Sequence, residues 1–533
     1  MFILRKKKIV GSKAYRTVLL VESVWNEEKK SPRHKTILNL SKWDESYINA
    51  LDMALKGKQG FSIQDLETAS GKSVGGLIVI KKIADRIGIT GALGKTKYAG
   101  LTLLLIMGRI LSKGSRLKLC EWGETQEIET ITGVRSYNED RLYETLDWLS
   151  ANQEKIEQRL FKHRYKKDGK KPALYLYDIT SSYLEGDCND LGEYGYNRDG
   201  KRGKKQIVVG LMTDKKGIPV SIEVFKGNTS DSTTVIGQIE KMATLFGVEK
   251  LVFVGDRGML KSTQINTFSK HINYITAITK EHIKTLVKTG VIQLELFEED
   301  LTEIEDNGIR YFARRNPIRA KEIQKTRADK IANLSQKIDV SNRYLKAHPK
   351  AKASTQLAYL NQQIKKVCLA AICSLSQHDN GKIQLVINQK KEDELRLLDG
   401  CYVIKTDLRK DEVSAQQAHQ RYKDLAFVEK AFRTMKTGCL EIRPIFVRKE
   451  SRTRGHVFVT MLAYMIVQHF WEHVRKLNIT LDHAWNTLDH LHTTIVKLND
   501  KSVNRIPTPS KTCQNILTAL DIKLPDNLPL VVN

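Results

Sequence analysis

The stretch ALYLYDITSSY, residues 173–183, predicts a buried β-strand that carries an acid. Under the two-residue period of a strand, Asp178 shares one face with two leucines. A second apolar run, LVFVG at 251–255, has the composition of a strand covered on both faces, and Asp256 follows it directly. Either aspartate alone could equally belong to a turn or cap. Because α/β sheets place their active sites at the ends of neighbouring central strands, the pair together indicates a site.

Further strands and one helix surround these two stretches. Residues 204–228 predict a β-hairpin, and residues 273–280 predict another strand. Between them, residues 230–247 have the pattern of a helix. A hairpin beside strands that are connected through a helix indicates a mixed sheet flanked by helices, so the predicted fold class is α/β.

The chain divides into regions with different sequence patterns. A basic linker, HRYKKDGKKP at 163–172, precedes the strands, and a long polar stretch interrupts the core after its first strands. That stretch is far longer than the loops that usually join such elements, so we interpret it as an inserted domain. The predicted organisation is a basic β-meander at 1–60, a helical DNA-end-binding region at 61–165, the first part of the core at 170–281, an inserted α+β domain at 282–399, the second part of the core at 400–478 and a C-terminal helical region at 479–533.

Local patterns also predict elements inside the insertion and ahead of the core. Three segments of the insertion, 291–299, 309–316 and 382–389, are expected to be strands, and its middle to be two polar helices broken at 347–352. Before the core, a helix is expected to open with the capping box Ser136-Tyr137-Asn138-Glu139.

The overall charge favours a polyanionic partner. The sequence has 88 lysines and arginines against 61 aspartates and glutamates, a net charge of +27, and its cations are spread along the whole chain. Nucleic acid is the commonest partner of such a surface, although a generally basic protein would have the same composition.

Cysteines and apolar runs indicate the cellular compartment. Seven cysteines without C-x-x-C spacing indicate neither a disulfide framework nor a zinc site. The longest apolar run, 101–111, contains Arg109 and is too short to span a bilayer. The N-terminus has its charges after its apolar residues, the reverse of a signal peptide. We therefore expect a cytoplasmic protein without membrane association.

The stretch YKDLAFVEKAFRTMK, residues 422–436, predicts a single amphipathic helix, because it lacks Gly and Pro and its apolar residues share one face. Those apolar residues are Leu425, Val428, Phe432 and Met435. Beside them lie Tyr422, Glu429, Arg433 and Lys436. A solvated charged edge would give the same pattern.

Three converging carboxylates would change that interpretation. If Glu429 joins Asp178 and Asp256, the site has only oxygen ligands, which suits Mg²⁺ or Mn²⁺ rather than zinc. Two such ions about 3.5 to 4 Å apart can activate a water or a 3′-hydroxyl and stabilise the leaving oxygen of a phosphoryl displacement. A basic protein with this site is a candidate for cutting or joining nucleic acid strands.

These stretches resemble the DDE transposases of bacterial insertion sequences, which have a ribonuclease H-like core. The similar branch has the helical signature Y-x-x-R-x-x-x-E-x-x-x-x-x-x-K, which Tyr422, Glu429 and Lys436 match, whereas Leu425 occupies the Arg position. YDITSSY and VGDRGM are similar to the contexts of the first two acids, as are 195–206 and 443–458 to other stretches of this branch. The resemblance covers about 170 to 475.

The resemblance implies a transposase that binds two Mg²⁺ or Mn²⁺ ions through Asp178, Asp256 and Glu429. It implies DNA partners, namely the inverted repeats at the element's ends and target DNA, a homodimer in the synaptic complex, and a nucleoid location in a bacterium. Lys436 is expected to hold DNA phosphate and Tyr422 to contact the strand end, while Arg433 could replace the missing arginine. The insertion is expected to approach the active site and the transposon end.

Two basic clusters are candidates for lining a DNA channel, although either could be a solvated loop. They are Lys201, Arg202, Lys204 and Lys205 before one strand of the core, and Arg448, Lys449, Arg452 and Arg454 after the glutamate helix. Two alternatives remain open: a ribonuclease H-like host nuclease, and a DNA-binding protein without catalysis. Inverted repeats around the gene would distinguish the transposase from the nuclease.

Overall fold

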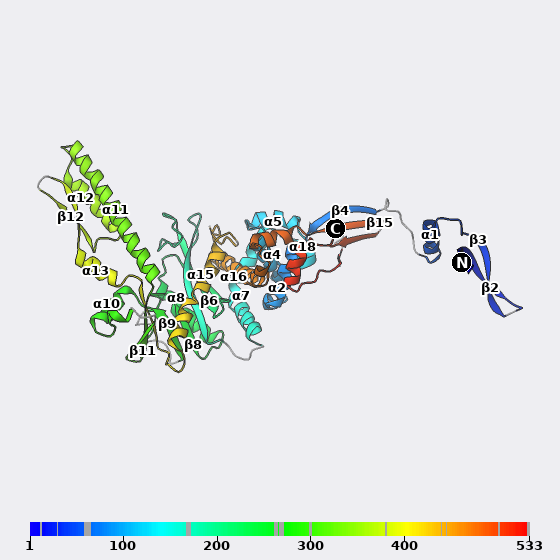
Figure 1. Ribbon diagram of the computed structural model, residues 1–533, viewed down its shortest axis with the longest axis horizontal. Coiled ribbons are helices and arrows are strands. Elements are labelled where there is room, and N and C mark those ends of the chain that lie inside the picture. The colour runs from blue at the N-terminus through cyan, green and yellow to red at the C-terminus, as the bar shows by residue number, and fades with distance from the viewer. Residues whose placement is uncertain are drawn as a thin grey trace. The chain divides into compact units, whose positions relative to one another are not determined.

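A computed structural model describes most of the chain (Figure 1). The described residues are 1–10, 13–28, 30–57, 66–166, 172–260, 265, 271–297, 301–378, 381–438, 440–443, 445–498 and 501–529. Two compact units are present: Met1–Lys72 with His492–Thr508 and Leu524–Asn533, and Ser73–Leu491 with Pro509–Lys523. Residues 167–171 of the predicted basic linker lie outside the described residues.

The first unit contains two small sheets. One is the meander β1 (Phe2–Val10), β2 (Lys13–Asn26) and β3 (Ser31–Asn39), followed by α1 (Glu45–Leu55), and its buried core includes Val18, Leu40 and Ile48. The other has the strand order β17 (Asn527–Leu528), β16 (Lys501–Arg505), β15 (His492–Leu498) and β4 (Leu66–Ser73). The C-terminal region is therefore only partly helical, because its β-branched stretch HTTIVKL pairs as a strand.

Helices form one part of the second unit. They are α2 (Gly75–Arg86), α3 (Ile89–Leu93), α4 (Lys97–Leu111), α5 (Arg116–Glu124), α6 (Ile128–Thr132), α7 (Glu139–Tyr165), α16 (Glu450–Val474), the short η3 (Arg475–Leu477), α17 (Leu481–Asp489) and α18 (Lys511–Ala519). The long helix α16 packs against α7, α4 and the core strand β7, which explains why it is apolar on most sides. No described helix is long and apolar enough to cross a membrane.

The cap of α7 differs from the predicted one. The helix begins at Glu139, and Asn138 is its cap, with its side-chain oxygen accepting a hydrogen bond from the Arg141 N–H at 3.0 Å. Ser136 therefore lies outside the helix start. The capping-box spacing placed the helix start two residues early, because an asparagine caps as well as a serine.

An eight-stranded mixed sheet forms the other part of the second unit and confirms the predicted α/β class. Its order is β10 (Thr302–Asp306), β11 (Ile309–Arg315), β14 (Cys401–Thr406), β9 (Ile272–Ala277), β8 (Leu251–Gly255), β5 (Leu174–Tyr183), β6 (Gln206–Asp214) and β7 (Pro219–Lys226). Strands β5, β8 and β9 are parallel and the other pairs are antiparallel. Hairpin β6–β7 beside parallel strands is consistent with a ribonuclease H-like core.

Helices α7 and α8 (Asp231–Thr244) cover one face of this sheet. Their apolar residues, including Phe161 and Ile239, share a buried core with Tyr175, Tyr177 and Phe253 of the central strands. Because side chains alternate along a strand, Asp178 of β5 lies on the opposite face from Tyr177. The core thus fixes which face of the sheet carries the acid.

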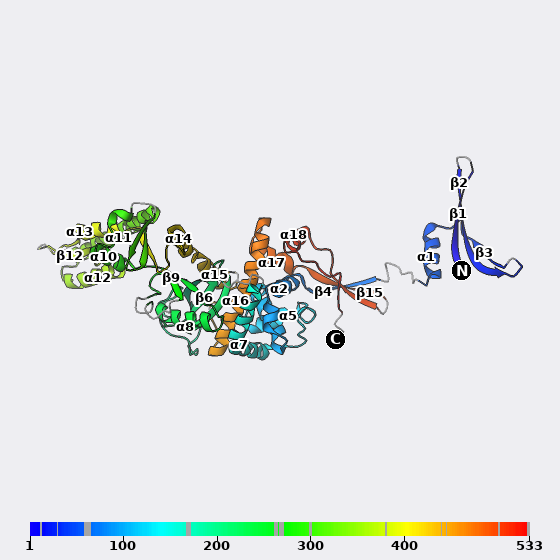
Figure 2. The ribbon, with the colours of Figure 1, turned by 90° about the horizontal axis from the view of Figure 1, so that it is seen from below.

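The inserted stretch gathers at one end of the second unit (Figures 1 and 2). Its elements are α10 (Lys280–Lys288), the 3₁₀ turn η2 (Leu294–Phe297), α11 (Pro317–Ala347), α12 (Ala353–Lys366), β12 (Cys373–Gln377), β13 (Ile383–Ile387) and α13 (Gln389–Leu397), in addition to β10 and β11. A separate core that includes Leu334, Leu360 and Ile383 holds α11, α12, β12 and β13 together.

One expected strand of the insertion differs in the structure. The stretch expected as a strand at 291–299 contains η2, and its buried Phe297 belongs to a small core beside β11 and β14. The strand expected at 309–316 is β11, which pairs with β14 and so extends the main sheet. The two predicted polar helices do break where expected, between Ala347 and Ala353.

The single helix predicted at 422–436 is wrong, because the structure has two helices, α14 (Ala415–Lys423) and α15 (Ala426–Lys436). The Asp424 side chain accepts a hydrogen bond from Gln420 at 3.0 Å. The N–H groups of Phe427 and Val428 then bond three residues back, each at 2.9 Å, which tightens the turn. The predicted apolar face is buried in the structure, with Leu425 at the junction.

Candidate active site

The register of the parallel strands brings Asp178 and Asp256 to one edge of the sheet. Tyr177 pairs with Gly255 across β5 and β8, so the next residue on each strand is the aspartate. Asp178 is half-buried and Asp256 is exposed. Asp256 therefore directly follows the end of β8, as the sequence predicts, whereas Asp178 lies in the middle of β5, which continues with buried residues to Tyr183.

Glu429 lies in the first turn of α15, which packs against β5. Its side chain is exposed and lines a cavity of about 610 Å³ together with both aspartates. Three carboxylates from two strands and one helix thus face the same space. Within the described part of the chain, none of the three forms an ion pair with a lysine or arginine.

The carboxylates repel one another. Burial raises the pKa of Asp178 to about 7, the Ile179 N–H that donates to it at 2.8 Å opposes this shift, and the charges of Asp256 and Glu429 raise the pKa further. Crowded, unpaired carboxylate oxygens are the donor set that Mg²⁺ and Mn²⁺ prefer. In donor type the residues therefore fit such an ion.

The three carboxylates line one cavity but lie too far apart to bind one ion together in this structure. Among the residues that the structure describes, no three His, Cys, Asp or Glu side chains are grouped closely enough to hold a metal ion. The cavity at these carboxylates is wide, and Glu429 reaches it from an exposed helix position, so its side chain has room to change rotamer.

Tyr422 holds one of the acids in place. Its hydroxyl donates a hydrogen bond to the Asp256 carboxylate at 2.9 Å, from the last turn of α14. Burial and the neighbouring Asp256 raise the pKa of Tyr422, so the hydroxyl remains a donor at neutral pH. The break between α14 and α15 therefore separates Tyr422 from Glu429 while both line one cavity.

Lys436, expected at DNA phosphate, binds a carboxylate of the protein instead. Its amine contacts Asp199 at 2.8 Å, and Arg443 contacts the same carboxylate oxygen. Asp199 is almost fully buried, with 1% of its side chain exposed, and Lys436 has 12% exposed. Burial lowers the pKa of Lys436, and the bond to Asp199 opposes this. Lys436 thus ties the glutamate helix to the loop that precedes β6.

The predicted basic clusters contain both paired and unpaired cations. Lys204 pairs with Glu185 at 2.7 Å, and the Lys201 amine lies over the Tyr183 ring. Arg452 pairs with Asp147 at 3.1 Å, so this expected DNA ligand joins α16 to α7.

Arg454 is likewise engaged inside the protein. It pairs with Glu450 at 2.8 Å and donates to the Val224 carbonyl at 2.8 Å, so it joins α16 to β7. By contrast, three exposed arginines of the predicted DNA-binding set have side chains without an ion-pair or hydrogen-bond partner among the described residues, namely Arg202, Arg433 and Arg448. Lys205 is half-buried and Lys449 is exposed.

Four further cations line the cavity, Arg257, Lys280, Arg319 and Lys423, and Arg319 belongs to the insertion that is expected to approach the active site. Arg257 and Lys423 directly follow Asp256 and Tyr422 in the sequence, and that adjacency was the available signal. Lys280 and Arg319 come from the start of α10 and the start of α11, so only the fold brings them to the acids. The insertion therefore reaches the cavity through the first turns of α11.

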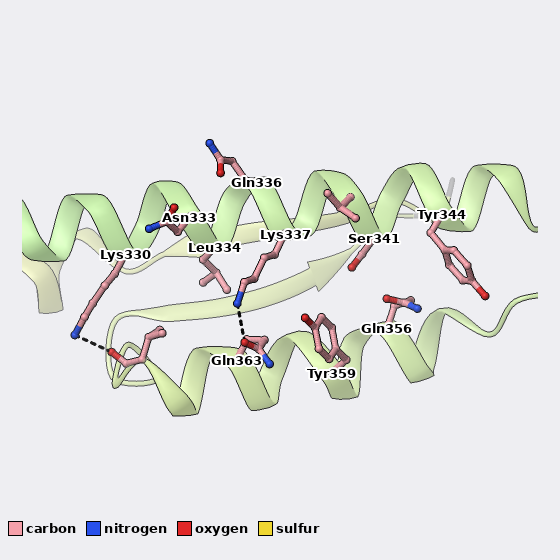
Figure 3. A pocket seen from close by; sticks show the side chains of 12 residues that line it. Lys330, Asn333, Leu334, Gln336, Lys337, Ser341, Tyr344, Gln356, Tyr359 and Gln363 are labelled. Carbon is pink, nitrogen blue, oxygen red and sulfur yellow. Dashed lines mark hydrogen bonds between the residues drawn. The ribbon is translucent and has the colours of Figure 1, made fainter. Parts of the chain in front are cut away.

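Another cavity, of about 710 Å³, lies between α11 and α12 and is shown in Figure 3. Lys330 donates to the Val367 carbonyl at 3.3 Å and Lys337 to Gln363 at 2.8 Å, both across this space. Its lining includes amides, lysines and the exposed rings of Tyr344 and Tyr359, but no carboxylate. It therefore lacks the ligands for a divalent cation.

Comparisons with known proteins find both a family and a similar solved structure. Residues 170–466 match the model of the family described as "Transposase DDE domain". Among solved structures, the chain is similar to a piggyBac transposase in a synaptic complex with hairpin DNA, at 9% identity and a TM-score of 0.33, over 77% of this chain and 76% of that one. No curated protein matches the chain.

Proposed function

This chain belongs to the family of DDE transposases, and on that premise we propose that Asp178, Asp256 and Glu429 are its catalytic, metal-binding carboxylates. As a DDE transposase it cuts and joins DNA and depends on divalent metal ions. The observation that carries the assignment is the single cavity that all three carboxylates line without a cationic partner within the described chain. The match of residues 170–466 spans all three positions.

The ions of this proposal are Mg²⁺ or Mn²⁺, two in number, held by the same three residues. Bound there, they would polarise the attacking and leaving oxygens of a phosphoryl displacement. The chain's own part is to present the carboxylates and orient them. Tyr422 fixes one carboxylate oxygen of Asp256 by its hydrogen bond, which leaves the other oxygen available. Tyr422 acts through Asp256 and is a positioning residue.

DNA phosphates are assigned to exposed cations of the second unit. Arg202, Arg433 and Arg448 are the arginines of the predicted set whose charge is not used by a described carboxylate, and Arg257 and Lys423 line the cavity itself. Arg433 would supply the charge that Leu425 does not, because it lies one turn beyond Glu429 on α15.

The substrate that we propose is the element's own DNA. The signature residues Tyr422, Glu429 and Lys436 support a bacterial insertion sequence with inverted repeats at its ends. We assign recognition of those ends to the first 165 residues, since the catalytic core must act on more than one sequence. A homodimer would bring two ends together.

The test is strand cleavage on DNA that carries the inverted repeats found around the gene. We expect cleavage and joining with Mg²⁺ or Mn²⁺, and loss of both on addition of a chelator, measured on labelled end-containing duplexes. Binding to the same duplex, followed by gel shift, should persist in the chelator. Cleavage that continues without divalent metal would contradict the proposed carboxylate site.

The salt dependence of DNA binding tests the phosphate contacts. Alanine replacement of Arg202, Arg433 or Arg448 should weaken binding to any sequence and reduce the slope of log K against log salt by about one for each phosphate that is no longer bound. Lys204→Ala is the matched control, because its charge already pairs with Glu185. Equal effects of Lys204→Ala and the three arginine variants, measured by fluorescence anisotropy, would reject the assignment.

A further inference from the structure

A small cationic cavity lies in the helical part of the second unit. Its volume is about 210 Å³, and its lining comes from the end of α4, the start of α5, the side of α7, the segment before α16 and α16 itself. The charged and polar residues that carry the argument are Arg109, Lys113, Arg116, Glu441, Arg443 and His456. None of them is among the carboxylates assigned to catalysis.

Two buried arginines converge in this cavity on one histidine nitrogen. Arg116 contacts Nδ1 of His456 at 2.9 Å and Arg109 contacts the same atom at 3.4 Å, and all three residues are less than 10% exposed. Both guanidinium groups are donors, so Nδ1 must be the acceptor and the imidazole must be neutral. Burial and the two arginines lower the pKa of His456 well below its ordinary value, in agreement with that assignment.

The two guanidinium groups have no bonded carboxylate in the described chain. Arg109 donates to the carbonyls of Leu440 and Glu441, each at 3.4 Å, and these neutral groups do not cancel its charge. The Nε of Arg116 is buried and has no hydrogen-bond partner among the described residues. Buried charges are costly unless paired, and an unmade hydrogen bond adds to that cost.

The neighbouring carboxylates do not compensate the positive charge of Arg109 and Arg116. Lys113 pairs with Asp482 at 3.4 Å and Arg443 pairs with Asp199, so their countercharges are already used. The carboxylate of Glu441 acts on Arg109 and that of Glu139 on Arg116, but neither forms an ion pair with these arginines. Burial and the charge of Arg116 lower the pKa of Arg109 to about 9, so it stays charged at neutral pH.

We propose that this cavity binds a phosphate group between Arg109 and Arg116. Guanidinium groups match the oxygens of phosphate better than any other side chain, and the Arg116 guanidinium lines this cavity with its Nε–H unused. The N-terminus of α5, a helix of nine residues that begins at Arg116, adds a favourable partial charge. The exposed Phe446 lines the cavity and the exposed Arg448 follows it by two residues, which favours a phosphodiester of DNA over a free phosphate.

Thermal unfolding of the full chain tests the site, with inorganic phosphate as the probe against chloride at equal ionic strength. Phosphate should raise the folding equilibrium constant by about 11-fold when its concentration is ten times the Kd. Arg116→Gln, and Arg116→Lys with its charge retained, should both lose most of this increment. An absent phosphate effect in the wild type, or an undiminished one in both variants, would overturn the proposal.

Arg310→Gln is the matched buried control. Arg310 is 2% exposed, but its guanidinium pairs with Glu303 at 2.9 Å and donates to the carbonyls of Leu408 and Val413. This variant should lose stability equally in both salts and keep the phosphate increment. If Arg116 had a purely structural role, Arg116→Gln would behave like Arg310→Gln. It would lose the same stability in phosphate and in chloride and would keep the phosphate increment.

A DNA-binding measurement distinguishes a phosphodiester of DNA from free phosphate as the ligand of this cavity. If a phosphodiester occupies the site, Arg116→Gln should weaken DNA binding in chloride and reduce the log–log salt slope by about one. Unchanged DNA affinity without the phosphate increment would assign the site to free phosphate. Asp178→Asn should keep the increment in either case, so the catalytic assignment and this site can fail separately.

Discussion

Asp178→Asn, Asp256→Asn and Glu429→Gln should each reduce DNA cleavage and joining by about 10³-fold or more, while DNA affinity stays within about twofold. The reason is that one cavity collects all three carboxylates, so the loss of one disturbs every ion bound there. The measurement is single-turnover cleavage of an end-containing duplex, beside a binding isotherm in the same buffer. Asp85→Asn, which affects an exposed carboxylate paired with Lys81 on α2, is the matched control.

In contrast to cleavage, the stability of the folded protein should not fall when Asp178 is replaced by asparagine. The pKa of Asp178 in the folded protein is raised to about 7, so its protonated form favours folding at low pH and that contribution is lost as the pH rises through about 7. In a chelator at pH 8, Asp178→Asn should therefore be at least as stable as the wild type in urea. Added Mg²⁺ should stabilise the wild type and leave the variant unchanged.

Two outcomes would contradict these expectations in different ways. Normal cleavage by Glu429→Gln alone would mean that Glu429 is not the third catalytic acid. Unfolding of all three variants, seen by circular dichroism, would assign the acids a structural role.

Asp199→Ala should lower the free energy of unfolding by about 3 kcal/mol or more, which is the second large effect that we expect. The Asp199 carboxylate is buried and pairs with both Lys436 and Arg443, so its removal leaves two cations in a partly buried place without a partner. The measurement is urea unfolding at pH 7. Glu185→Gln, which breaks the more exposed pair with Lys204, should cost only about 0–1 kcal/mol.

A second variant tests the cause of that loss. Replacing Lys436 by Met in the Asp199→Ala background removes one of the two unpaired charges and should recover part of the stability. No recovery would mean that Asp199 contributes through its loop rather than through the ion pairs. Cleavage should also fall in Asp199→Ala, because Lys436 and Glu429 share α15.

The two aspartates could be predicted because each one follows a local signal. Strand periodicity places Asp178, an apolar run ends at Asp256, and parallel pairing then aligns them. The break after Tyr422 had no such signal, since no Gly or Pro marks it and a side-chain bond to Asp424 accompanies it. The partner of Lys436 lies 237 residues away, a separation that no local pattern encodes.

The basic clusters show a second limit of the sequence. Arg448 and Arg452 are four residues apart and look equivalent, yet Arg448 is exposed and Arg452 pairs with Asp147 of α7. Whether a cation is available to a ligand depends on which acids the fold brings to it. Composition therefore indicated the kind of partner, and the structure was needed to choose the residues.

The way in which the insertion joins the sheet has an evolutionary consequence. The chain leaves β11 at Arg315 and returns to β14 at Cys401, which are opposite each other in neighbouring antiparallel strands, and the Asn316 N–H bonds to the Gly400 carbonyl at 2.9 Å. Departure and return are thus adjacent, as in an ordinary hairpin. The residues between these two positions can therefore be added, exchanged or deleted in evolution without any change in the order of the strands in the sheet.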